Sequence, residues 1–120
     1  MDSQLRELGF QIIGISPDQP SKVRETIEKH SIRFTLLSDS SMTAAKALGI
    51  AYRVNESTLQ ALAQYGVDLQ VASGQAHQLL PVPAVFVVSK ETIQFEYINP
   101  DYSVRLHPDL LLRAAQLARP

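Results

Sequence analysis

Cysteine and tryptophan are both absent from this chain of 120 residues. No hydrophobic run approaches the ~20 residues that cross a bilayer. Without cysteine, these residues hold no disulfide, no thiolate metal site and no thiol nucleophile. The polar opening MDSQLRELGF also lacks the apolar core of a signal peptide. We therefore expect a cytoplasmic protein with no membrane partner.

Clustered positive charge is absent too. Eleven Lys and Arg residues are balanced by twelve Asp and Glu residues, which gives a formal net charge of −1. A surface that tracks a phosphate backbone needs a basic patch, so we expect no nucleic-acid partner. Hydrophobic residues make up 45% of the chain and charged residues 19%, as is usual for a globular domain. The length predicts a single domain, residues 1–120, with its own core.

Strand and helix signals alternate along the chain. Continuous apolar runs predict strands at Phe10–Ile15 and Ile32–Leu37, and a tight turn between Ala84–Val88 and Ile93–Ile98 predicts a hairpin. Residues 66–80 are expected to be loop, with a short strand at Leu69–Ala72. The helix signals are Gln4–Leu8 before Gly9, a helix from Pro20 to near His30, Met42–Leu48, Glu56–Tyr65 capped by Asn55, and a final helix from Pro108. This order predicts an α/β fold, a mixed sheet flanked by helices.

Few residues present a pattern that carries chemistry. Asp39 stands between Ser38 and Ser40 before a helix, which favours a helix cap over a functional carboxylate. His30, His77 and His107 lie far apart without metal-ligand spacing, so no metal site is expected. No glycine-rich phosphate loop and no serine elbow occurs, and no cofactor is expected.

The segments FQIIGISPD, FTLLSD followed by a helix ending in ALGI, and VPAVFVV resemble the alkyl hydroperoxide reductase and thiol-specific antioxidant family of peroxiredoxin-like proteins. The resemblance covers residues 1–50 and 80–118, and residues 51–80 are then a family-specific insertion. It implies a thioredoxin-like fold that lacks its N-terminal strands and the helix start bearing the catalytic cysteine. In the family, that thiolate attacks the peroxide. No catalytic residue is assigned in this chain.

The resemblance points to three site-shaping residues: Val82, Pro83 and Arg105. It favours a cis peptide bond before Pro83, whereas the residues alone favour trans, because cis bonds are about 5–6% of X–Pro bonds. Val82 and Pro83 stand where the family carries an arginine. Arg105, in YSVRLHP, faces the active-site side on one interpretation and is a solvated charge on the other.

The resemblance implies a hydroperoxide-reducing, antioxidant redox domain, and a thiol reductant as partner of the complete protein. Whether this chain is an enzyme stays open, since without cysteine we expect it to be inactive by itself. The alternative is a non-catalytic interaction module with a thioredoxin fold. The absent strand of the fold would lie between Phe10–Ile15 and Ala84–Val88. Either these strands pair directly, or a separate polypeptide fills the gap, or a homodimer or other oligomer covers the exposed strand edges, which we expect.

Overall fold

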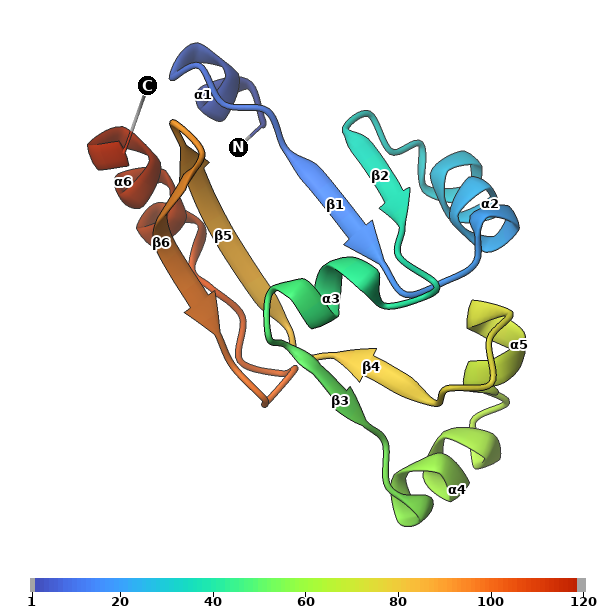
Figure 1. The fold of residues 1–120 in the computed structure, drawn as a ribbon. Coiled ribbons are helices and arrows are strands. Elements are labelled where there is room, and N and C mark those ends of the chain that lie inside the picture. The colour runs from blue at the N-terminus through green and yellow to red at the C-terminus, as the bar shows by residue number, and fades with distance from the viewer. Residues whose placement is uncertain (1, 119–120) are drawn as a thin grey trace. The chain divides into compact units, whose positions relative to one another are not determined.

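The computed structural model describes residues 2–118 and confirms the α/β class (Figure 1). Contacts divide the chain into two compact units, one built from both ends of the chain (up to Ile12 and from Val82 onward) and one from Ile13–Pro81. The helices are α1 Asp2–Glu7, α2 Pro20–His30, α3 Thr43–Ala47, α4 Glu56–Gln64, α5 Leu69–Ser73 and α6 Pro108–Ala118. The strands are β1 Ile13–Ser16, β2 Thr35–Ser38, β3 Ala51–Arg53, β4 Leu79–Pro81, β5 Ala84–Ser89 and β6 Thr92–Ile98.

The Ile13–Pro81 unit begins with a parallel pair of strands, β1 and β2, joined through α2. The pair is in register from Ile13 opposite Thr35 to Ser16 opposite Ser38. Gly14 leaves room for the side chain of Leu36, the residue opposite it in the ladder, because a Cβ at this position would lie only 2.8 Å from Cδ1 of Leu36. Helix α2 packs against β2, and Val23 is the buried residue of this helix.

Residues 51–81 of the same unit contain a pair of short strands that the sequence did not predict. Strands β3 and β4 pair in antiparallel fashion, with Tyr52 opposite Leu80, and enclose α4 and α5 between them. The predicted short strand at Leu69–Ala72 is wrong, because this segment is helix α5. Asp68 explains the difference: its Oδ1 accepts hydrogen bonds from the backbone N–H groups of Gln70 and Val71 and so caps a helix.

The other unit contains the predicted hairpin. Strands β5 and β6 pair from Ala84 opposite Ile98 to Ser89 opposite Thr92, with a bulge at Val87/Val88. Its turn residues Lys90 and Glu91 both have positive φ, as a two-residue type I′ turn requires. Helix α6 packs on both strands and contacts α1.

Each unit has a small core of its own. Val87, Leu5 and Ala115 are buried in the hairpin unit. Met42, Ala45, Val54 and Val23 are buried in the Ile13–Pro81 unit, and Met42 is fully enclosed there. The strand pairs among residues 2–118 are β1–β2, β3–β4 and β5–β6. Direct pairing of β1 with β5, one of the three alternatives for the absent strand, is therefore not among them. Covering of the strand edges by an oligomer stays a prediction.

Candidate functional site at the open end of the hairpin

The three residues predicted to shape a site all belong to the hairpin unit. Val82 and Pro83 directly precede β5, where Val82 is half-buried and Pro83 exposed. The backbone N–H of Asn99, just after β6, donates a hydrogen bond to the carbonyl oxygen of Pro83 over 3.1 Å. This bond continues the ladder beyond its last strand pair, so Pro83 and the segment leading to Arg105 leave the hairpin at the same end.

Our preference for a cis peptide bond before Pro83 is wrong. No peptide bond is cis in the described part of the chain, so the bond before Pro83 is trans. A trans proline fits this place, because the ring stands at a strand start and its missing N–H removes no ladder bond.

The connector after β6 is folded by side chains that sequence reasoning missed. The amide nitrogen of Asn99 donates to Oη of Tyr97 over 3.2 Å, and that hydroxyl donates to the carbonyl oxygen of Val104 over 3.4 Å. Oδ1 of Asn99 in turn accepts from the N–H of Asp101. The signal for this arrangement was present in the sequence, since Asn-Pro-Asp before a serine is typical of successive side-chain-to-backbone turns.

Electrostatics at this end are set by Asp101 and Arg105. The Ser103 hydroxyl, 2.6 Å from Asp101 Oδ1, and then the Ser103 backbone N–H lower the pKa of the Asp101 carboxyl below its ordinary value of 3.8. Arg105 follows directly after Val104, is exposed, and makes no ion pair within residues 2–118. Its guanidinium is therefore available to a carboxylate, a thiolate or another anion. The exposure of Arg105 agrees equally well with the other interpretation of this residue, a solvated surface charge.

A second place where ligands commonly bind is the carboxyl end of the parallel strands β1 and β2. Here Ser38 Oγ donates to the carbonyl oxygen of Asp18, and Ser16 Oγ accepts from the N–H of Asp18. Asp39 accepts from the N–H groups of Ala44 and Ala45 through its two different carboxylate oxygens. The polar side chains at this end thus form hydrogen bonds with neighbouring backbone groups. The prediction that Asp39 caps a helix is confirmed.

The histidines also occupy separate places. His77 Nδ1 accepts from the N–H of Leu79 over 3.0 Å, so Nε2 carries the proton and donates to the carbonyl oxygen of Ser40 over 2.7 Å. His107 Nδ1 accepts from the N–H of Asp109 at the start of α6, and His30 is the last residue of α2. Among residues 2–118, no group of three potential His, Cys, Asp or Glu ligands is placed to hold a metal ion.

A small hollow in the Ile13–Pro81 unit has a volume of about 10 Å³, roughly that of one water molecule and far below the ~300 Å³ at which small-molecule pockets begin. Apolar side chains such as Pro17, Leu69 and Leu80 line it. It therefore suits no substrate of appreciable size.

Among the described helices, none is long and apolar enough to cross a membrane.

Comparison with known proteins decides the family. The model of the AhpC/TSA family matches residues 1–95, which is most of the chain. The chain belongs to the AhpC/TSA family. The matched range includes Val82 and Pro83, whereas Tyr97, Asn99 and Arg105 lie beyond it.

A relative in Haemophilus influenzae, named "Putative peroxiredoxin bcp", is 46% identical over 48 residues. The match covers 40% of this chain and 31% of the relative, so this chain spans about a third of the length of that protein. Membership of the AhpC/TSA family confirms the thioredoxin-like expectation for the fold.

Proposed function

We propose that this chain is part of a peroxiredoxin-like thiol redox protein and supplies scaffold and substrate-side residues, while the reacting thiol comes from outside these 120 residues. The proposal is supported by one observation, a family match in a chain that lacks the residue on which the family's chemistry depends. The AhpC/TSA family model matches residues 1–95, and the chain has no cysteine. Family membership supports the redox chemistry, and the composition requires that its nucleophile be supplied from elsewhere.

The chemistry consists of two balanced steps. A thiolate attacks one oxygen of a hydroperoxide, the O–O bond breaks, and the leaving alkoxide or hydroxide takes a proton, which leaves a sulfenic acid on sulfur. A second thiol, the reductant, then condenses with the sulfenic acid to give a disulfide and water. Arg105 suits the first step because a nearby guanidinium favours the thiolate over the thiol.

Mass spectrometry of the native protein in its source cells tests this proposal directly. We expect a polypeptide or a tight complex heavier than the 13.3 kDa of this chain, with at least one cysteine that iodoacetamide alkylates. A native protein of 13.3 kDa with no thiol-bearing partner would overturn the proposal. That result would favour the alternative function, a non-catalytic interaction module.

A hydroperoxide-consumption assay tests the same idea on the isolated chain. With hydrogen peroxide and dithiothreitol we expect no turnover above the buffer rate, because none of the side chains is a thiol. Circular dichroism of the same sample would show that the chain is folded. Turnover that survives removal of trace metals would contradict the proposal.

A further inference from the structure

We propose that residues 67–73, which carry helix α5, form a hinged lid over the carboxyl end of the β1–β2 pair, with Gln19 as its latch. The inference is independent of the redox chemistry, and every element it uses belongs to the Ile13–Pro81 unit. The carboxyl end of parallel strands is where ligands commonly bind in α/β sheets. A lid that covers this end and opens therefore controls access to it.

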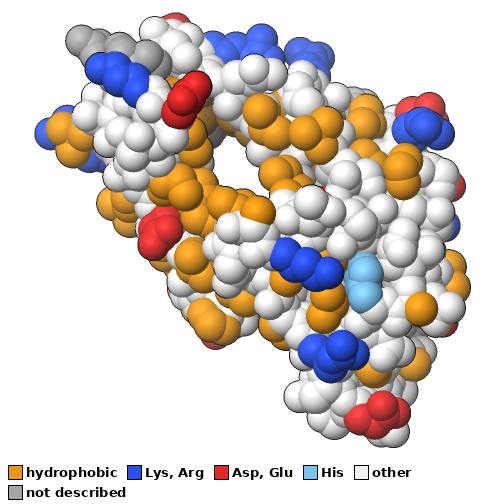
Figure 2. Space-filling model, in the orientation of Figure 1, with side chains coloured by type: hydrophobic (Ala, Val, Ile, Leu, Met, Phe, Trp, Pro, Cys, Tyr) orange, Lys and Arg blue, Asp and Glu red, His pale blue; other side chains and the backbone are white. Residues whose placement is uncertain are grey.

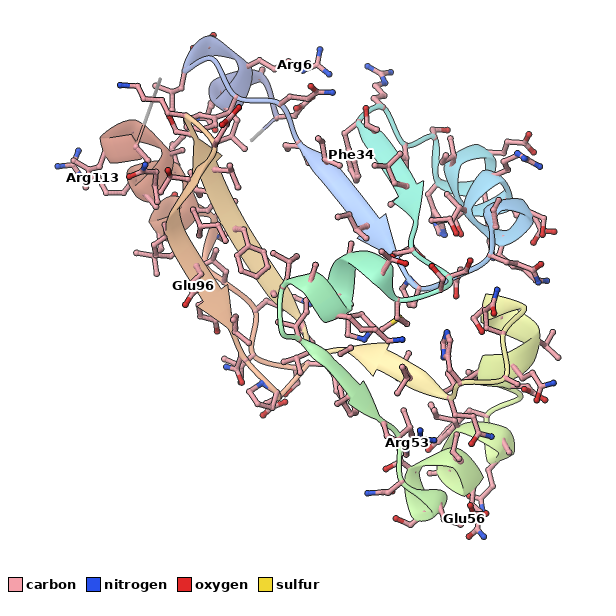
Figure 3. The ribbon with its side chains drawn as sticks, viewed as in Figure 1. Arg6, Phe34, Arg53, Glu56, Glu96 and Arg113 are labelled. Atoms are coloured by element: carbon pink, nitrogen blue, oxygen red, sulfur yellow. The ribbon has the colours of Figure 1, made fainter. Side chains whose placement is uncertain are left out.

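The position of the lid follows from the direction of the two strands. Strand β1 ends at Ser16 and leads directly into the turn to α2, and α5 is bonded to that turn. Figure 1 shows α5 beside the turn, near the tip of the β1 arrow. Phe34 directly precedes β2 and lies at the opposite end of the pair (Figure 3). The lid is thus at the carboxyl end of the strands.

Two hydrogen bonds join the lid to the turn, and Gln19 donates both. Its backbone N–H donates to the carbonyl oxygen of Ala72 over 2.8 Å, and Nε2 of its side chain donates to the carbonyl oxygen of Val71 over 2.8 Å. The side-chain bond is exposed to solvent, where water competes for the same groups and the net stabilisation is small. The latch can therefore be released and remade at low cost.

The lid is weakly packed against the turn. Ser73 is the buried residue of α5, but its hydroxyl donates to the carbonyl oxygen of Leu69 within the same helix. Val71 is 59% exposed. Leu69 and Ala72 of the lid and Pro17 of the turn line the hollow of about 10 Å³, so close packing between lid and turn is incomplete.

Charge does not strengthen the closed position. Residues 69–75 contain no Lys, Arg, Asp or Glu, and Figure 2 shows the surface over α5, at the right-hand edge of the view, as largely uncharged. Asp68 makes no ion pair within residues 2–118, and its Oδ1 caps α5 itself. Segments with little apolar burial and solvent-exposed hydrogen bonds open locally while the rest of the structure stays folded.

A glycine stands at each end of the lid. Gly66 has a φ of 76° and Gly74 a φ of 71°, and glycine can leave this left-handed region at little steric cost. A Cβ at Gly66 would meet no atom within 4 Å, whereas one at Gly74 would lie 3.3 Å from Oε1 of Gln19. The first end is thus unobstructed, and the second lies against the latch. Such residues absorb the backbone rotation when a short segment moves as a unit.

Amide hydrogen exchange of the complete chain tests the lid. When the lid detaches, the N–H of Gln19 loses its acceptor, and a helix of five residues does not persist alone, so the N–H of Gly74 exchanges in the same event. We expect the two protection factors to agree within about threefold. The N–H of Asp39, which donates to the carbonyl oxygen of Ser16 whether the lid is open or closed, should be more protected. Protection factors at Gln19 and Gly74 that differ by more than about tenfold would overturn the proposal.

The latch has its own test. Gln19→Ala removes the side-chain bond to Val71 and should lower the protection factors of the N–H groups at positions 19 and 74 about fivefold, with that of Asp39 unchanged. The matched control is Gln75→Ala, which removes an exposed glutamine beside the lid and should leave all three values as they are. An unchanged protection factor at Gly74 in Gln19→Ala would contradict the role of Gln19 as latch.

Should Gln19→Ala loosen the whole unit, seen as faster exchange at Asp39, thiol trapping decides instead. The chain has no cysteine, so one introduced thiol reports on one position. Ala72→Cys places the thiol on the half-buried underside of the lid, and Val71→Cys places it on the exposed side of the same helix. Iodoacetamide should react at least about fivefold more slowly with the first than with the second, because the first requires opening. Equal rates would overturn the proposal.

Discussion

Replacement of Asp39 by alanine tests the hydrogen bonds by which this carboxylate caps helix α3. The carboxylate accepts from the N–H of Ala44 over 3.0 Å and from the N–H of Ala45 over 2.9 Å, each with a different oxygen. Loss of a helix cap costs about 0.5–2 kcal/mol. Because two N–H groups lose their acceptor at a half-buried position, we expect about 2 kcal/mol for Asp39→Ala. At about 4 °C per kcal/mol, the melting temperature should fall by about 8 °C.

Urea unfolding followed by circular dichroism measures this loss, and amide hydrogen exchange localises it. The N–H groups of Ala44 and Ala45 should lose protection in Asp39→Ala. Asp39→Asn keeps one oxygen acceptor and should lose about half as much stability, about 1 kcal/mol. Glu28→Ala, an exposed acidic residue on α2, serves as control and should change stability by less than about 0.5 kcal/mol. Unchanged exchange at Ala44 and Ala45 in Asp39→Ala, or equal losses in the alanine and asparagine variants, would refute the capping argument.

Three further predictions concern the local contacts of one residue each. His77→Phe removes both hydrogen bonds of the ring and should cost about 2 kcal/mol in urea unfolding, because their backbone partners are left unpaired. Gly14→Ala should cost about 1 kcal/mol by overpacking against Leu36, and Leu36→Ala in the same chain should remove that extra penalty in a double-mutant cycle. The stability that the Asp101 carboxylate gives its turn should be present above pH 3.8 and be lost as the pH falls through its lowered pKa. Ser103→Ala should return that pKa toward 3.8 in an NMR titration.

Much of the chain could be predicted because its local signals agree with its structure. The αL cap at Gly9, the first-turn Pro20 and the cap residue Asn55 mark helix boundaries by backbone chemistry alone, and the structure places helices accordingly. The hairpin of Ala84–Ser89 and Thr92–Ile98 likewise follows from alternation around a tight turn.

The errors have different physical origins. Strands β3 and β4 have three residues each, which is too short for hydrophobic periodicity to indicate a strand. They form because they pair with each other, although α4 and α5 separate them in the sequence. At Leu69–Ala72 we predicted a short strand, but Asp68 caps this segment as a helix. The Pro83 isomer was inferred from the resemblance rather than from the residues, and the trans bond observed is the one that the residues alone favour.

The candidate site shows a different kind of limit. The sequence indicated Pro83 and Arg105 separately, but the link between them passes through Asn99 and Tyr97, whose bonds depend on the hairpin register. Once Ala84 is opposite Ile98, the next residue on each side is fixed, and Asn99 meets Pro83. The geometry of the site is thus a consequence of strand pairing, which no local motif encodes.

Scaffold and chemistry are separable in this chain. Membership of the AhpC/TSA family rests on residues 1–95, and none of the residues in that range is a thiol. A fold can carry a function only through the side chains at its site, and an exposed guanidinium, an amide and a phenol can orient a reactant but cannot replace an attacking sulfur. If the missing nucleophile is supplied by another segment or partner, Arg105→Gln should lower the turnover of the complete system and leave its thermal stability unchanged, because the side chain makes no ion pair within residues 2–118. Equal loss of turnover and stability would instead show that Arg105 serves the fold.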